Sequence, residues 1–134
     1  MATITAIEGV GEVNAEKLKK AGISSVEKLL KMGAEPGGRR EIAAKTGINE
    51  KVILKWVNFA DLFRIKGIST QYSELLEAAG VDTVVELSKR VPENLQKKME
   101  EVNEEKNLVR RVPVLKEVQK WTEQAKQLPR GVNY

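Results

Sequence analysis

Apolar residues recur along most of the chain at the three-and-four spacing of amphipathic helices, and no stretch alternates with the period of a strand. The strongest helical pattern covers residues 49–64, with an asparagine at its start that suits a helix cap. A second one covers residues 114–128 and is ended by Pro129. Each carries one tryptophan, Trp56 or Trp121, on its apolar side. The pattern predicts an all-α protein in which both tryptophans anchor the core.

The same pattern of apolar residues and glycines occurs twice, 58 positions apart. When residues 7–30 are set against residues 65–88, two glycines, one alanine and five large apolar residues coincide. The coinciding pairs are Ile7 and Ile65, Gly9 and Gly67, Leu18 and Leu76, Ala21 and Ala79, Gly22 and Gly80, Ile23 and Val81, Val26 and Val84, and Leu29 and Leu87. The chain is therefore predicted to contain two diverged copies of one unit.

Each copy is expected to contain two short helices joined by a tight turn. In the first copy the opening helix begins at Val13 or Asn14 and ends at Gly22, because glycine is favoured as a left-handed helix stop. Ser24 or Ser25 then caps the next helix. In the second copy, the equivalent helices run over 71–79 and from a cap at Asp82 or Thr83.

The segments outside the repeated parts are expected to be less regular. Residues 35–38, Glu-Pro-Gly-Gly, predict a loop, and residues 129–134 predict a loose C-terminal tail. Trp121 lies farther from the start of its copy than Trp56 does, so the second copy contains an insertion. The charged segment 97–106 is the expected place for it.

Residues 43–53 have the four-and-six spacing of a helix-turn-helix, with Ala43, Gly47 and Ile53 at the key positions. A helix that reads DNA bases from this corner would expose Asn49, Glu50, Lys51 and Lys55. Such spacing is common in helical proteins. A helical corner inside the repeat is therefore the favoured interpretation.

These elements predict an all-α fold of two tandem repeats with longer connecting helices, packed as one compact body. The first repeat is expected at residues 1–64, the second and more degenerate one at 65–128, and the tail at 129–134. The 134 residues, 41% of them apolar, suit one globular body, whereas two independent domains of about 65 residues would each be marginal.

Composition narrows the chemistry. The chain contains neither cysteine nor histidine, which excludes thiol nucleophiles, imidazole bases and the usual zinc and haem ligands. No pair of carboxylates has a recognisable catalytic context, so we predict no enzyme, catalytic residue, metal site, cofactor or small-molecule substrate. No window approaches the roughly 18 uncharged residues that a membrane span needs, and the start of the chain lacks the features of a signal peptide. We therefore expect a cytoplasmic protein.

The segment Ile7-Glu8-Gly9-Val10-Gly11, followed by a helix, a glycine stop and a second short helix, resembles a helix-hairpin-helix motif. The second copy keeps Gly67 but has Ser69 where the second glycine belongs, so it resembles a degenerate member. The whole chain is similar to a bacterial family known only as a domain of unknown function that contains such hairpins.

The resemblance implies sequence-independent binding of double-stranded DNA through the hairpin backbone. Two glycines let a turn approach a phosphate closely, and amides at the start of the following helix point toward the anion. Contacts to phosphate carry no base information. The residues to which the resemblance assigns this role are Gly9, Val10, Gly11, Val13, Lys17, Lys20, Gly67, Ile68 and Ser69.

Two arginine pairs are further candidates for phosphate contact. Arg39 and Arg40 form one pair and Arg110 and Arg111 the other, and no other arginines are adjacent in the sequence. The net charge of +4, from 23 basic and 19 acidic residues, adds only a mild preference for a polyanion. A solvated surface is the alternative interpretation of both pairs.

Three features favour a different partner, namely another protein. Glu8 and Glu12 place carboxylates beside the first hairpin, where a phosphate would lie. The second hairpin lacks a glycine, and the basic excess is shallow: residues 1–64 have 11 basic and 8 acidic side chains, and residues 65–134 have 12 and 11. The alternative function is therefore a protein-interaction adaptor or scaffold that uses this fold without nucleic acid.

Overall fold

The computed structural model describes residues 3–134, which are helical apart from turns, loops and one isolated bridge between Thr3 and Ser25. Two compact units make up the chain. Unit 1 comprises the described residues up to Asp61 together with Gly131–Tyr134, and unit 2 comprises Leu62–Arg130. The prediction of an all-α protein is confirmed.

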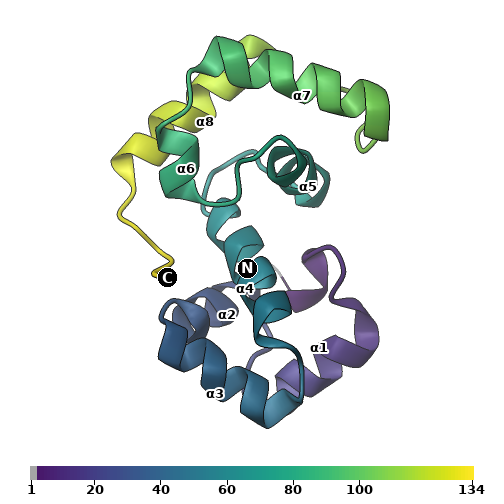
Figure 1. Ribbon diagram of the computed structural model, residues 1–134, viewed down its shortest axis with the longest axis vertical. Coiled ribbons are helices and arrows are strands. Elements are labelled where there is room, and N and C mark those ends of the chain that lie inside the picture. The colour runs from purple at the N-terminus through teal and green to yellow at the C-terminus, as the bar shows by residue number, and fades with distance from the viewer. Residues whose placement is uncertain (1–2) are drawn as a thin grey trace. The chain divides into compact units, whose positions relative to one another are not determined.

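Unit 1 contains a short 3-10 helix, η1 (Ile4–Ala6), and the helices α1 (Gly11–Lys20), α2 (Val26–Gly33), α3 (Pro36–Thr46) and α4 (Glu50–Leu62), whose last residue belongs to unit 2. Helix α3 packs against α1 and α2, and η1 packs against the same two helices (Figure 1). Helix α1 begins at Gly11, the last residue of the first predicted hairpin.

Unit 2 contains α5 (Thr70–Ala78), α6 (Val84–Ser88), α7 (Pro92–Lys106) and α8 (Leu115–Gln127). Helix α8 packs against both α6 and α7, and α5 packs against α7 (Figure 1). Their apolar faces form one core cluster, in which Leu75, Leu76, Leu87 and Met99 are fully buried.

Both tryptophans lie in the core, as predicted. Trp56 and Trp121 are each only 3% exposed. Each indole also lies under the first glycine of a hairpin. A Cβ atom built on Gly9 would lie 3.7 Å from Nε1 of Trp56, and one on Gly67 would lie 3.1 Å from Nε1 of Trp121. The helices that carry the tryptophans, residues 50–62 and 115–127, therefore support the hairpins from below.

Residues 58 positions apart form the same local hydrogen bonds in the two units. One bond closes the hairpin, one ends the first helix and one caps the second helix. In unit 1 these run from Val10 N to Ile7 O (3.3 Å), Ile23 N to Leu18 O (2.9 Å) and Lys28 N to Ser25 Oγ (3.1 Å). In unit 2 they run from Ile68 N to Ile65 O (3.3 Å), Val81 N to Leu76 O (2.8 Å) and Glu86 N to Thr83 Oγ1 (3.2 Å).

The predicted loop at residues 35–38 is wrong, because α3 begins at Pro36. Proline suits the first position of a helix, where its missing N–H needs no partner. Gly38 lies inside the helix because α2 and α3 approach closely: a Cβ at Gly38 would lie 2.0 Å from the carbonyl oxygen of Met32. Gly38 therefore permits a close backbone contact between two helices and does not form a flexible turn.

Helix α1 begins at Gly11, two or three residues earlier than the predicted start at Val13 or Asn14. The bond from Val10 N to Ile7 O closes the hairpin immediately before this point. No further residues are therefore needed between the hairpin and the helix.

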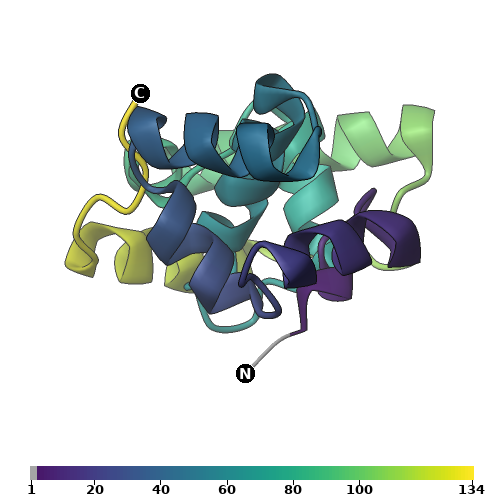
Figure 2. The same cartoon turned by 90° about the horizontal axis from the view of Figure 1, so that it is seen from below.

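The C-terminal residues do not form a loose tail. Val132 is 2% exposed, and the amide of Asn133 donates to the carbonyl of Ala34 at 2.8 Å. The chain end lies beside the start of α3 in both views (Figures 1 and 2). Arg39 holds it there, because its guanidinium donates to Asn133 O at 2.7 Å. Unit 1 is thus completed by residues from the far end of the chain.

The expected insertion, residues 97–106, lies within α7, which has 15 residues where α3 has 11. Among the helices that the structure describes, none is both long and apolar enough to cross a membrane.

Candidate nucleic-acid interface

At Gly11 the first hairpin presents its backbone without a covering side chain. Gly9 and Gly11 have φ angles of +91° and +65°, in the left-handed region that glycine adopts most easily. A Cβ built on Gly11 would have no heavy atom within 4 Å. The glycine at position 11 is therefore required by its backbone angle and not by packing inside the unit.

Helix α1 starts at this hairpin without a side-chain cap, unlike α2, α5 and α6, which Ser25, Ser69 and Thr83 cap. In an uncapped helix the first amides need an acceptor from solvent or from a partner. Gly11 and Val13 are exposed at this end. Val10, by contrast, is 2% exposed and spends its amide on Ile7 O, so the prediction that it donates to a partner is wrong.

Charges of both signs surround the first hairpin. Lys17 and Lys20 are exposed on α1, as a phosphate contact would need. Glu8 and Glu12 are exposed as well, and Val13 is 73% exposed between them and the lysines. The hairpin therefore combines an open backbone with a mixed electrostatic surface.

The second hairpin is closed by its own unit. Gly67 has a φ of +98°, but Ser69 Oγ accepts a hydrogen bond from Tyr72 N at 3.3 Å and so caps α5. The side chain of Gln124 on α8 binds the backbone of Lys66 twice, with its Oε1 accepting from N at 3.0 Å and its Nε2 donating to O at 3.3 Å. Ile68 is 7% exposed and its amide is bound to Ile65 O, which contradicts its predicted role as a donor to a partner.

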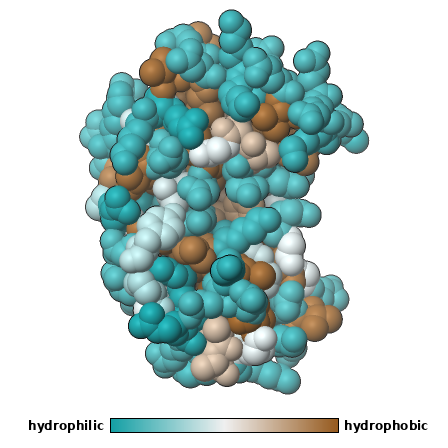
Figure 3. Space-filling model, viewed as in Figure 1, coloured by the Kyte–Doolittle hydropathy of each residue, from teal (hydrophilic) through white to brown (hydrophobic). Residues whose placement is uncertain are grey.

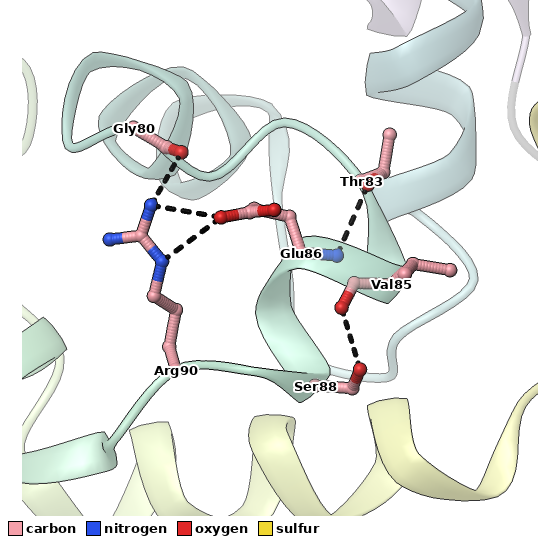
Figure 4. A network of polar contacts seen from close by, with 6 residues as sticks. All are labelled: Gly80, Thr83, Val85, Glu86, Ser88 and Arg90. Carbon is pink, nitrogen blue, oxygen red and sulfur yellow. Dashed lines mark hydrogen bonds and ion pairs between the residues drawn. The ribbon is translucent and has the colours of Figure 1, made fainter. Parts of the chain in front are cut away.

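The turn after the first long helix of each unit, at Gly22 and at Gly80, is likewise open in unit 1 and covered by a side chain in unit 2. Gly22 has no heavy atom within 4 Å of a built Cβ. At Gly80 the guanidinium of Arg90 lies 3.3 Å from such an atom and donates to Gly80 O at 2.9 Å. Figure 4 shows Arg90 bridging Gly80 and the carboxylate of Glu86, while Thr83 caps the helix between them.

The first arginine pair is divided by burial. Arg39 is 4% exposed and donates to the carbonyl oxygens of Gly33 (2.8 Å), Ala34 (3.1 Å) and Asn133 (2.7 Å). Its prediction as a phosphate contact is therefore wrong, because the side chain is buried and its hydrogen bonds are made inside unit 1. Arg40 is exposed and stays a candidate.

The second arginine pair lies in one pocket with the second hairpin. The pocket has a volume of about 470 Å³ and is lined by Ser69, Gln71, Tyr72, Leu108, Val109, Arg110 and Arg111. Arg111 forms a two-fold contact with Glu117, at 2.8 and 3.2 Å. The hydrogen bond with Glu117 raises the pKa of Arg111 above its ordinary value. Two sets of residues that the sequence suggested separately, Ser69 and the arginine pair, are thus neighbours.

Gln124, Arg90 and Tyr72 were missed in the sequence analysis. Gln124 lies three residues after Trp121 and therefore on the same side of α8, which is the signal that could have found it. Arg90 and Tyr72 bind carbonyls that are distant in sequence, Gly80 O and Arg111 O, and no local pattern marks them.

No cluster of three or more acidic residues that could hold a metal ion occurs within residues 3–134. Polar residues cover most of the face shown in Figure 3, and the apolar residues on it form separate small patches.

No curated protein and no solved structure matches the chain significantly. A family profile does match it, over residues 8–128. That span includes both hairpins, both tryptophans and the arginine-lined pocket. The chain belongs to the family described as a domain of unknown function, DUF4332.

Proposed function

We propose that this protein is a non-catalytic binding module that holds double-stranded DNA, without reading its sequence, through the backbone of its first hairpin. The open backbone at Gly11, with a φ of +65° and no heavy atom near a built Cβ, carries the proposal. A position that is conformationally demanding yet touches nothing inside its unit suits close approach by a partner.

We also propose that residues 7–30 and 65–88 are two helix-hairpin-helix units. The equivalent hydrogen bonds at positions 58 apart support this interpretation. So do the two tryptophans, whose indoles lie under Gly9 and Gly67. The second unit is a degenerate copy in which Ser69 replaces a glycine and Gln124 occupies the hairpin backbone.

A phosphate group would bind where α1 begins. The uncapped amides of its first turn provide donors, and the helix dipole adds a partial positive charge. Lys17 and Lys20 lie on the same helix and would neutralise further backbone charge. None of these groups reads a base edge, so binding is expected to be indifferent to sequence.

The test is duplex binding as a function of salt. Affinity should be measurable at about 50 mM salt and should fall steeply by about 200 mM, because released counterions drive the contact. Duplexes of unrelated sequence should bind equally well. Failure to bind any duplex at the lower salt concentration would overturn the proposal.

A matched pair of variants separates loss of the contact from loss of folding. Gly11→Ala and Gly47→Ala place the same methyl group at positive φ angles of +65° and +74°, both with no heavy atom within 4 Å. Each should lose about 1–2 kcal/mol of stability from backbone strain. Only Gly11→Ala should lose duplex binding, since only that methyl group lies where the phosphate approaches.

A protein-interaction adaptor is the second candidate function, and the exposed Val13 favours it. An apolar side chain that is 73% exposed beside Glu8 and Glu12 suits a protein partner better than a phosphate. Replacing both glutamates with lysine distinguishes the two functions. The double variant should bind duplex more tightly if DNA is the partner, and a folded double variant without such a gain would favour the adaptor.

A further inference from the structure

The loop that follows α7 is fixed at several points by side chains of α7 itself and of α5. Asn103 donates to Val109 O at 3.0 Å and accepts from Val109 N at 2.9 Å. Tyr72 donates its hydroxyl to Arg111 O at 3.2 Å. Gln96 donates to Pro113 O at 3.2 Å. The backbone on both sides of Arg110 is therefore held in place.

Arg110 itself is the exception within this loop. Its side chain is exposed, and no hydrogen bond or ion pair engages it within residues 3–134. Its neighbour Arg111 is instead paired with Glu117, which also accepts from Val114 N at 3.2 Å. The fixed loop thus carries one uncommitted guanidinium.

We propose that Arg110 and the pocket beside it bind a phosphate group of nucleic acid, as the contribution of unit 2 to the proposed duplex binding. The proposal rests on that proposed function. In it, unit 2 contacts the nucleic acid through the Arg110 pocket and not through its hairpin, which is closed. Besides Arg111 and Tyr72, whose side chains bind Glu117 and the carbonyl of Arg111, three residues that line the pocket carry hydrogen-bond donors: Arg110, Gln71 and Ser69.

Ser69 keeps a donor even though it caps α5. A hydroxyl has one proton to donate and two lone pairs to accept with, and the cap with Tyr72 N uses only a lone pair. Gln71 is exposed, and no acidic side chain lines the pocket. The volume of about 470 Å³ leaves room for a phosphate together with part of its sugar.

The fixed loop also explains why this arginine would bind well despite being on the surface. Ordering a mobile loop reduces affinity, whereas a loop that is already ordered reduces it little. Arginine further suits phosphate because its planar guanidinium can donate two parallel hydrogen bonds. The pocket therefore combines a charged side chain on a pre-ordered backbone with two neutral donors.

The experiment compares Arg110→Ala with Lys98→Ala in the full chain, on a short duplex and at several salt concentrations. Both substitutions remove one positive charge from an exposed side chain of unit 2, but Lys98 does not line the pocket. Arg110→Ala should weaken binding about three- to tenfold and reduce the slope of log K against log salt by about one. Equal effects of the two substitutions would overturn the proposal.

A second measurement uses inorganic phosphate as the probe and records amide chemical shifts. The amides of Ser69, Gln71 and Arg110 should shift with saturation in the wild type and should not do so in Arg110→Ala. Absence of saturable shifts at these positions would overturn the proposal. Shifts without any duplex binding would keep the phosphate site but replace nucleic acid by a free phosphorylated ligand as its source.

The test of the Arg110 pocket can fail independently of the test of the first hairpin. If Gly11→Ala abolishes duplex binding while Arg110→Ala behaves like Lys98→Ala, the pocket proposal fails and the hairpin proposal stands. If Arg110→Ala weakens binding while Gly11→Ala behaves like Gly47→Ala, the hairpin proposal fails and the pocket proposal stands.

Discussion

The two hairpins share their local geometry but differ in what covers them. In unit 1 a built Cβ at Gly11 or Gly22 meets no atom within 4 Å. In unit 2 the corresponding regions are occupied, by the Ser69 cap and Gln124 at the hairpin and by Arg90 at Gly80. A hairpin whose hydrogen bonds are completed internally gains stability but has less capacity for a partner. The comparison indicates that unit 1 presents backbone and unit 2 presents side chains.

The units also differ in how they are completed. Unit 2 is one continuous segment, Leu62–Arg130, whereas unit 1 includes Gly131–Tyr134 from the end of the chain. Arg39 makes this connection by donating to Ala34 O and Asn133 O. The more open unit is therefore the one that depends on a distant segment.

Removing the tryptophan under each hairpin should have the largest effect. Trp56→Ala and Trp121→Ala should each reduce the free energy of unfolding by about 3–5 kcal/mol, because both indoles are buried and leave a cavity. Trp121 also packs on Tyr72, with ring centroids 5.4 Å apart, so its loss should disturb the Arg110 pocket as well. Denaturant unfolding with hydrogen exchange of the hairpin amides measures both effects. A loss below about 1 kcal/mol would contradict the assigned role.

Replacing Arg39 should open unit 1 selectively. Arg39→Met removes three hydrogen bonds to carbonyl oxygens while keeping most of the volume, so we expect a loss of about 2–3 kcal/mol. Hydrogen exchange of the Asn133 amide should accelerate most, because its segment loses the guanidinium that holds it. Arg40→Met is the matched control, since Arg40 is exposed, and it should change stability by less than about 0.5 kcal/mol. Equal losses of stability in Arg39→Met and Arg40→Met would show that Arg39 does not hold the chain end.

Removing the Gln124 amide should make the second hairpin resemble the first. Gln124→Leu deletes both bonds to the Lys66 backbone and should reduce stability by about 1 kcal/mol. The amide of Lys66 should then exchange as fast as that of Glu8, the matching position in unit 1. Gln119→Leu, on the same helix but without contact to the hairpin, provides the comparison. If the Lys66 amide stays protected from hydrogen exchange in Gln124→Leu, the two bonds from Gln124 are not what closes the hairpin.

The smallest effect is a pH dependence confined to unit 2. The hydrogen bond from Arg111 lowers the pKa of Glu117 below its ordinary value, and the bond from Val114 N adds to this, while partial burial opposes it. Because the folded pKa is the lower one, the stabilisation is present above the unfolded pKa of about 4.3 and is lost as the pH falls through the folded value. The stability difference between wild type and Glu117→Gln should therefore shrink between about pH 6 and about pH 3. A difference that persists at the lower pH would count against this pair.

Local signals predicted the elements that depend on neighbouring residues. A glycine that stops a helix and a hydroxyl that caps the next act within three or four residues, and Gly22, Gly80, Ser25 and Thr83 occupy the predicted positions. The hydrophobic spacing likewise placed both tryptophans in the core. The helical class followed from the same hydrophobic spacing.

Where glycine or arginine makes contacts with distant segments, the sequence alone was misleading. The glycines before Arg39 suggested a loop, but Gly38 is needed for the close approach of α3 to the carbonyl of Met32. Arg39 suggested a surface charge, but it is buried on a carbonyl 94 positions away. Such partners leave no local pattern, because burial and hydrogen-bond acceptors are set by packing. Only the tertiary structure separated Arg39 from Arg40 and placed Arg110 beside Ser69, since segments far apart along the chain meet only once the helices have packed.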